Sequence, residues 1–355
     1  ASVQQHRARW QRATTPDQRA GVLRDLLAGL GVSHTGYYRP GDPAWFELLD
    51  LFREGPTREA IPRLFSGGVV RYETLGLVLT ELDGGTYVAD VLEGTPAFEA
   101  GVRVGERLLA AAELERVPRE RSTSPPPPGP TRLLLSSDGG GERLVDVTPL
   151  RIQPEELYLT AQRASARIFD RDGYRVAYVR LRSWASPRYQ ELLERQLLDG
   201  DLSAADALVL DQRGGWGGAD PGDVTRVGGR APELRMRRRG EPESEAAEPR
   251  PEPDRAWTRP VVLLVDGTTR SGKEVVAFAF RSQGLGPVVG ERTAGAVLGG
   301  RPFVLQDGSL LMLAVADVTV DGERLEGVGV EPDVVVPRDL RADVGGDPQL
   351  EAALE

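Results

Sequence analysis

The chain has 355 residues, of which 44 are basic and 54 acidic, so its net charge at pH 7 is −10. This acidic balance argues against a general nucleic-acid-binding protein, which would carry a basic patch. The absence of cysteine excludes disulfides, thiol catalysis and cysteine-ligated metal sites, but it does not fix the cellular compartment. No apolar run approaches the ~20 residues of a membrane-spanning helix, and the length suggests two or three domains.

Groups that could accept a proton are scarce. The histidines are His6 and His34, the one lysine is Lys273, and the remaining positive charge is arginine, which rarely accepts a proton. If the protein is an enzyme that needs a general base, the candidates are His34, Lys273, a carboxylate and, less favourably, His6. We expect His6 to be solvated because it lies near the terminus.

Residues 1–65 are predicted to be a helical N-terminal region. Thr15 and Gln18 flank a proline in a capping-box pattern, and apolar residues then recur at helical spacing until Gly31, a plausible stop. A second helix is predicted over residues 42–53, where Asp-Pro opens another apolar pattern.

Residues 66–150 are predicted to form a separate β-rich domain. Short β-rich runs alternate with glycine-rich turns, and one short helix is expected among residues 94–101. The proline-rich stretch 118–130 is predicted to be a surface loop.

Residues 151–340 alternate predicted strands and helices, which indicates an α/β core. The expected strands cover residues 176–181, 207–210, 261–265 and 287–289, with helices starting near residues 186 and 271. Residues 227–260 are predicted to contain a mobile insertion because few of them are apolar. Residues 341–355 are expected to be a C-terminal tail.

The turn 266–274 (DGTTRSGKE) could carry a nucleophile. It follows an apolar strand, and Ser271 opens the next helix. Its hydroxyl would lie beside unsatisfied helix N–H groups that can stabilise an oxyanion. The alternative is that Ser271 only caps the helix.

A glycine-rich loop, residues 211–218 (DQRGGWGG), follows another apolar strand. Four glycines let the backbone approach a ligand closely and point N–H groups at it. The loop could instead be merely flexible, but the carboxyl end of a strand in an α/β sheet favours a ligand site.

Together these loops resemble the C-terminal processing peptidases, or tail-specific proteases. The glycine loop and the Ser271–Glu274 spacing are joined by Gly-Glu-Arg-Thr at 290–293, Asp-Gly-Ser at 307–309 and Gly-Val-Glu-Pro-Asp at 329–333. The motifs stand in the family's order over roughly residues 20–340. The resemblance implies a serine endopeptidase with an α/β core of the crotonase/ClpP type.

The same family inserts a PDZ domain before the core, and residues 75–109 are similar to one. The most specific stretches are Gly-Thr-Pro-Ala at 94–97 and Ala-Gly-Val-Arg-Val-Gly-Glu at 100–106. PDZ domains add an extended chain end to a sheet edge and capture its carboxylate. The resemblance assigns peptide binding to the segment Leu75, Gly76, Leu77 and Val78, unless the domain only packs with its groove closed.

The chain departs from the best-known members, which pair the serine with a lysine three residues after the Gly-Glu-x-Thr stretch. That position is Ala296, so the Ser–Lys dyad is absent. Lys273 is two residues from Ser271 on one helix and does not face it. We expect Lys273 to be a solvated surface residue whose replacement leaves activity near the wild-type level.

Three explanations of this loss remain. The chain could be an inactive homologue that binds peptide C-termini, an engineered mutant, or an enzyme whose base is histidine. Tricorn core proteases, which are similar, use a Ser-His pair from the N-terminal region, and Ser33-His34 stands in a polar loop here. Neutral histidine, with a pKa near 6.5, suits this role, although His34 could also be only structural.

The tricorn resemblance also places a supporting glutamate three residues before Gly329, which is Glu326. Glu326 or Ser33 would hold the tautomer of the histidine ring; alternatively, Glu326 is an ordinary strand-end carboxylate. For the oxyanion hole we predict the N–H of Gly272 and that of either Gly217 or Gly218.

The sequence therefore predicts a serine endopeptidase that cleaves proteins or unstructured C-terminal tails, with an inactive peptide-binding homologue as the alternative. No metal site or cofactor is predicted, since the histidines and acids show no ligand spacing. The expected partners are protein or peptide substrates and not nucleic acid. We expect an extracytoplasmic location, in the periplasm or cell envelope.

Overall fold

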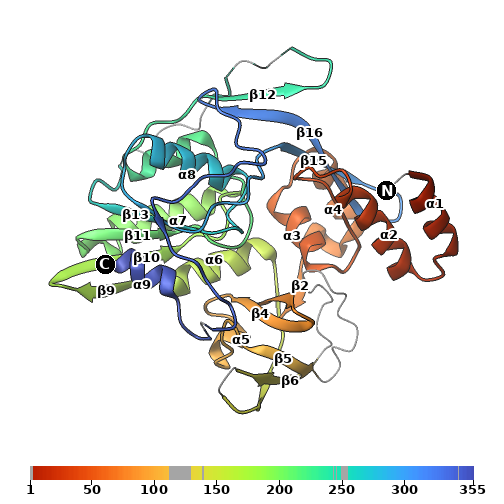
Figure 1. Ribbon diagram of the computed structural model, residues 1–355, viewed down its shortest axis with the longest axis horizontal. Coiled ribbons are helices and arrows are strands. Elements are labelled where there is room, and N and C mark those ends of the chain that lie inside the picture. Colours follow the sequence, from red (N-terminus) through yellow and green to blue (C-terminus); the bar gives the residue numbers. More distant parts are fainter. Residues whose placement is uncertain are drawn as a thin grey trace.

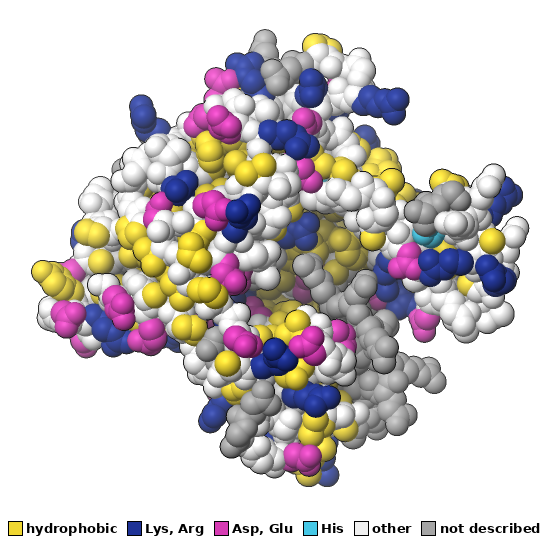
Figure 2. Space-filling view, viewed as in Figure 1, with side chains coloured by type: hydrophobic (Ala, Val, Ile, Leu, Met, Phe, Trp, Pro, Cys, Tyr) yellow, Lys and Arg dark blue, Asp and Glu magenta, His cyan; other side chains and the backbone are white. Residues whose placement is uncertain are grey.

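The computed structural model describes residues 3–111, 129–137, 140–242, 244, 246–248, 255–342 and 344–355. An α/β core, a small β-sheet and a group of N-terminal helices lie around a hollowed face of the molecule (Figures 1 and 2). Acidic and basic side chains are interspersed over this face rather than gathered by sign (Figure 2). None of the described helices combines the length and hydropathy needed to cross a bilayer.

The N-terminal region contains four helices and one short strand. The helices are α1 (Val3–Arg12), α2 (Pro16–Ala28), α3 (Pro43–Leu51) and α4 (Gly55–Leu64). Thr15 and Gln18 form the predicted capping box, but α2 ends at Ala28, before Gly31. The strand β1 (Gly36–Tyr38) lies in a segment predicted as loop and pairs with β16 (Leu310–Val320).

The predicted β-rich segment forms a five-stranded antiparallel sheet in the order β3-β4-β5-β6-β7. The strands are β3 (Leu77–Leu82), β4 (Gly85–Val91), β5 (Arg107–Ala111), β6 (Thr131–Ser136) and β7 (Arg143–Val147), with the short helix α5 (Pro96–Glu99) after β4. The sequence did not predict β5 and β6. Most of the proline-rich stretch 118–130 lies outside the described residues. A short pair, β2 (Tyr72–Thr74) with β8 (Leu150–Ile152), joins the segment to the rest of the chain.

The core is a six-stranded sheet in the order β17-β14-β13-β11-β10-β9, parallel except for the β9–β10 pair. Its strands are β9 (Arg167–Arg171), β10 (Tyr174–Arg180), β11 (Ala207–Asp211), β13 (Val261–Val265), β14 (Val288–Gly290) and β17 (Val334–Val335). The central strands are continuous apolar runs because both faces of the sheet are covered.

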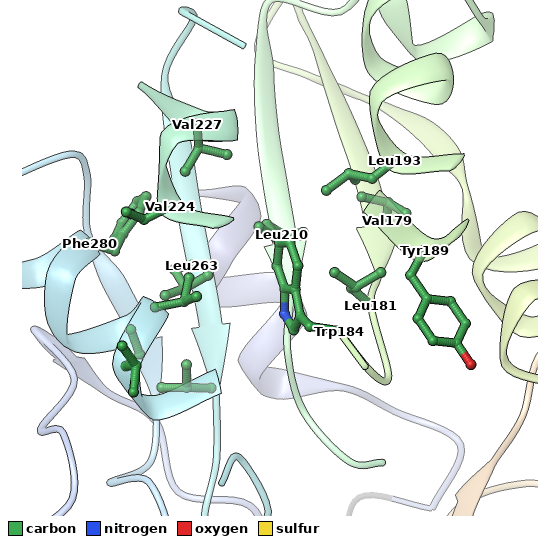
Figure 3. Packing of buried hydrophobic residues seen from close by; sticks show 14 of the residues in the cluster. Val179, Leu181, Trp184, Tyr189, Leu193, Leu210, Val224, Val227, Leu263 and Phe280 are labelled. Atoms are coloured by element: carbon green, nitrogen blue, oxygen red, sulfur yellow. The ribbon is translucent and has the colours of Figure 1, made fainter. Parts of the chain in front are cut away.

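One face of the core sheet packs against α6 (Pro154–Ser165), α7 (Pro187–Leu198) and α8 (Gly272–Ser282). Tyr189 and Leu193 of α7 and Phe280 of α8 belong there to the same buried cluster as Leu210 and Leu263 of the sheet (Figure 3). The opposite face packs against α9 (Pro348–Leu354). This arrangement holds the carboxyl ends of β11 and β13 side by side, and the two predicted loops leave from these ends.

Two segments contain secondary structure that the sequence did not predict. Residues 348–354 of the predicted C-terminal tail form α9, because Leu350, Ala353 and Leu354 recur on one helical face and bury against the sheet. The predicted insertion 227–260 contains β12 (Leu234–Arg238), which pairs with β16, and a buried Trp257. The strands β12, β15 (Gly299–Val304), β16 and β1 form a further sheet.

Candidate active site

Ser271 lies at the junction between β13 and α8, in a backbone conformation that few residues with a side chain adopt. Its φ is 60° and its ψ is −135°, which costs on the order of 1–3 kcal/mol. Its N–H donates to the carbonyl of Ala296 at 2.9 Å and to Glu274 Oε2 at 3.2 Å. Ala296 occupies the position at which the similar peptidases have the lysine of a Ser–Lys dyad. It contacts Ser271 through its backbone carbonyl.

Glu274 fixes the segment that faces this turn. Its buried carboxylate accepts hydrogen bonds from the Thr293 hydroxyl at 2.6 Å and from the N–H groups of Gly295 and Ala296 at 2.7 and 2.8 Å. Burial raises the pKa of Glu274 more than these donors lower it. The carboxylate therefore ties residues 293–296 to the first turn of α8.

The imidazole of His34 contacts the hydroxyl of Ser271. Nε2 lies 3.1 Å from Ser271 Oγ, although 237 positions separate the two residues in the chain. The ring packs over Gly300 of β15, where an added Cβ would come within 3.0 Å of His34 Cβ. Glycine at this position leaves room for the ring, and the β1–β16 pairing holds the loop in place.

Ser33 and Glu326 determine which ring nitrogen carries the proton. Ser33 Oγ lies 2.8 Å from Glu326 Oε2 and 2.9 Å from His34 Nδ1. An ionised carboxylate only accepts, so the single hydroxyl proton of Ser33 goes to Glu326, and Ser33 Oγ then accepts from Nδ1–H. Neutral His34 is thereby left with a lone pair on Nε2, directed at Ser271.

The carboxylate of Glu326 is stabilised in its charged form. Burial raises its pKa, but hydrogen bonds from the N–H and O–H of Ser33 and the N–H groups of Val297 and Leu298 outweigh this, so the pKa lies below its usual value. The acceptor at the end of this chain of hydrogen bonds is therefore charged at neutral pH.

His34 is neutral at physiological pH. Burial, followed by the nearby charge of Arg270, lowers its pKa to about 4 against an opposing effect of Glu326. An imidazole in this state can accept a proton from a hydroxyl.

The glycine loop reaches Ser271 at one residue. A Cβ built on Gly217 would lie 2.5 Å from Ser271 Cβ and 3.0 Å from its Oγ, whereas one built on Gly218 would meet Ala185 at 2.7 Å. Gly272 packs equally closely on Ala219. Of the two glycines left open by the sequence, Gly217 is the one beside the hydroxyl.

Lys273 contradicts its prediction as a surface residue. It is fully buried, and Nζ donates to the carbonyls of Arg182 at 2.9 Å, Gln212 at 3.2 Å and Gly214. As the i, i+2 spacing predicted, the side chain of Lys273 points away from Ser271. The glycine loop covers this side of α8 and shields the ammonium group from solvent. The sequence signal that could have revealed this is its status as the one lysine among 44 basic residues.

His6 is also buried rather than solvated, because α1 packs against α2. Leu75 and Gly76 precede β3, and Leu77 and Val78 begin this strand on the edge of the five-stranded sheet. In the described part of the chain, His, Asp and Glu form no group of three or more suited to a metal ion.

The chain is similar to known peptidases. Residues 175–336 match the model of peptidase family S41. The carboxyl-terminal-processing peptidase 1, chloroplastic, of Arabidopsis thaliana is 26% identical over 88% of this chain and 61% of its own length. Tricorn protease homolog 1 of Streptomyces coelicolor is 29% identical over 62% of this chain and 20% of its own length. The chain thus spans about three fifths and one fifth of these relatives.

A solved structure confirms the fold. The photosystem II D1 C-terminal processing protease aligns with a TM-score of 0.52 at 20% identity, over 98% of this chain and 92% of that one. The mixed α/β architecture is therefore shared, while the finer assignment to the crotonase/ClpP type and the PDZ identity of the small sheet stay predictions. Over residues 175–336 this chain is therefore similar to peptidase family S41.

Proposed function

We propose that this protein is a serine endopeptidase that cleaves proteins or unstructured C-terminal tails, with Ser271 as nucleophile and His34 as general base. The observation that carries the proposal is the 3.1 Å contact between His34 Nε2 and Ser271 Oγ. The Glu326–Ser33–His34 hydrogen bonds support it, because they leave Nε2 free to accept a proton.

The reaction follows from these contacts. His34 takes the proton of Ser271 as Oγ attacks the scissile carbonyl, and the N–H groups of Gly217 and Gly272 stabilise the resulting oxyanion. His34 then gives the proton to the leaving amine, which releases the C-terminal fragment and leaves an acyl-enzyme. A water molecule, deprotonated by His34, hydrolyses the ester and restores Ser271.

A fluorophosphonate probe tests the proposal directly. We expect stoichiometric labelling at Ser271, read by mass spectrometry of the digested protein, because His34 activates this hydroxyl above the other serines. Matched samples of the Ser271→Ala variant should take up no label. If the wild-type protein is folded, binds peptides and remains unlabelled, the inactive peptide-binding alternative holds instead.

Gly217 offers a test of the oxyanion hole. In Gly217→Ala the new Cβ would meet Ser271 at 2.5 Å, so the N–H must move, and we expect turnover to fall on the order of 100-fold. The control is Gly21→Ala in α2, where φ lies outside the left-handed region and nothing lies within 4 Å of the added Cβ. Unchanged peptide hydrolysis in the Gly217 variant would place the oxyanion donor elsewhere.

We also propose that the five-stranded sheet is a PDZ-like domain that captures substrate chain ends. Its edge strand β3 can pair with an extended peptide, and residues 75–78 lead into it. A peptide with a free, apolar C-terminus should then be cleaved faster than its amidated copy, measured as kcat/KM under identical conditions. Equal values would indicate that the domain does not read the carboxylate.

The location of the protein is proposed on the resemblance alone. The name of the Arabidopsis relative places that protein in the chloroplast, and we propose an extracytoplasmic site of action here. Fractionation of the native cells with an antibody to this chain would test it.

A further inference from the structure

Lys273, in the first turn of α8, takes no part in the proposed reaction. Its side chain is entirely inaccessible to solvent. An ammonium group has three N–H donors, and three backbone carbonyls receive them, those of Arg182, Gln212 and Gly214. A protonated Nζ so placed has no lone pair, so it cannot serve as the base for Ser271.

These three carbonyls belong to the segments that shape the glycine loop. Gln212 and Gly214 lie in the loop, and Arg182 lies two residues after the end of β10, the strand that pairs with β11. The Arg182 carbonyl also accepts the N–H of Trp216 at 2.8 Å, and a Cβ on Gly215 would come within 2.0 Å of it. The first part of the glycine loop therefore surrounds Lys273 Nζ, and Gly217, near the end of the loop, lies beside Ser271.

We propose that Lys273 is a positioning residue whose ammonium group binds the glycine loop to α8 and thereby holds the Gly217 N–H in place for the oxyanion. This inference rests on the proposed peptidase function. A side chain of the same length without N–H donors would take one hydrogen bond from each of the three carbonyls. Those of Arg182 and Gln212 would keep the Trp216 N–H and the Thr269 hydroxyl, but the Gly214 carbonyl would lose the donor that the described residues give it, which is unfavourable for an acceptor shielded from water. The loop would relieve this by moving away from α8, and Gly217 would move with it.

The charge of Lys273 is sensitive to pH in the neutral range. Burial, then the charges of Arg180 and Arg182 on the β10 side, lower its pKa to about 7, against the opposing effects of Asp211 and Asp266. Arg180 and Arg182 both form ion pairs with Asp90 of β4 and with Glu93, which follows this strand. A neutral amine has only two N–H donors, so deprotonation releases one carbonyl.

The proposal therefore predicts a fall in kcat at alkaline pH that follows Lys273. Because the chain contains one lysine, labelling with ¹⁵N-lysine gives a single side-chain nitrogen signal in the wild-type enzyme. Its titration midpoint should lie near 7 and coincide with the alkaline limb of kcat for a peptide substrate. An alkaline limb of kcat that does not follow the lysine titration, whatever the midpoint of that titration, would overturn the proposal.

The matched variants are Lys273→Met, which keeps the length of the stem, and Arg281→Met, which removes an exposed cation from the other end of α8. We expect Lys273→Met to lower kcat on the order of 100-fold with little change in KM, and to lose the alkaline limb. Arg281→Met should resemble the wild type. Circular dichroism checks folding; a folded Lys273→Met enzyme with wild-type kcat and pH profile would overturn the proposal.

The failure of the two proposals can be told apart. If Ser271 is not the nucleophile, the wild-type protein remains unlabelled by fluorophosphonate at every pH. If only the role of Lys273 is wrong, the wild type is labelled at Ser271 and the Lys273→Met protein is labelled at the same rate. Should Lys273→Met not fold, the wild-type comparison of the lysine titration with kcat still decides the question.

Discussion

His34→Ala is expected to lower kcat by about 100- to 10,000-fold in peptide hydrolysis, the range typical of a lost general base. Within the described part of the chain, the His34 ring is the group placed to accept the proton of Ser271 Oγ, and the alanine variant leaves this role to solvent. The measurement is kcat and kcat/KM for one peptide at neutral pH, with protein concentration corrected for the folded fraction.

Two control variants separate chemistry from backbone strain. His34 has a φ of 52°, a region that asparagine tolerates better than alanine. His34→Asn should therefore keep the loop conformation and still lose activity. His6→Ala, which removes the other histidine, should retain the activity of each folded molecule. An active His34→Asn enzyme would rule out histidine as the base.

The pH dependence gives an independent check on His34. Its lowered pKa predicts an acid limb of kcat/KM near pH 4, below the value of about 6.5 expected from sequence. The unfolded chain binds this proton near pH 6.5 and the folded protein only near 4, so the free energy of unfolding falls as pH drops from 6.5 toward 4. Above pH 6.5 this contribution is constant, and His34→Asn should remove it.

Ser271→Ala is expected to abolish peptide hydrolysis, because no acyl-enzyme can form. Stability should change by only about 1 kcal/mol, the usual effect of a lost helix cap, since the backbone contacts of Ser271 to Ala296 and Glu274 remain. Mass spectrometry of the reaction products measures the hydrolysis, and thermal unfolding measures the stability.

The matched control is Ser282→Ala at the other end of α8, where the hydroxyl bonds only locally to the Ala279 carbonyl among the described residues. That enzyme should retain full turnover. A Ser271→Ala protein that still cleaves the peptide would require a different nucleophile, whereas one that binds uncleaved substrate could be used to isolate physiological substrates.

Much of the core could be predicted because its signals are local. The strand β13 matches its predicted range 261–265, and Ser271 caps α8 as expected. The proline after Ser186 opens α7 in the same way. Each of these features depends on the spacing of apolar residues and on capping residues that lie within a few positions of one another. Such local patterns can be read from a single sequence.

Features that depend on distant partners were missed. The strand β1 consists of Gly-Tyr-Tyr, and its conformation comes from pairing with residues 310–312. The burial of Lys273 depends on carbonyls up to 91 positions away, and the lowered pKa of His34 depends on the loops that close around it. The proximity of His34 and Ser271 was inferred through family resemblance, since no local pattern encodes a contact across 237 residues.

The long separation between the site residues has a consequence during synthesis. Ser33 and His34 leave the ribosome before Ser271, and Glu326 is 293 residues beyond Ser33. The β1–β16 pairing that holds the histidine loop also needs residues 310–312, and such non-local contacts form late in folding. A nascent chain therefore cannot assemble the hydrogen-bonded site before residue 326 has been synthesised, and under the proposed peptidase function this delay prevents self-cleavage and damage to neighbouring nascent proteins until then.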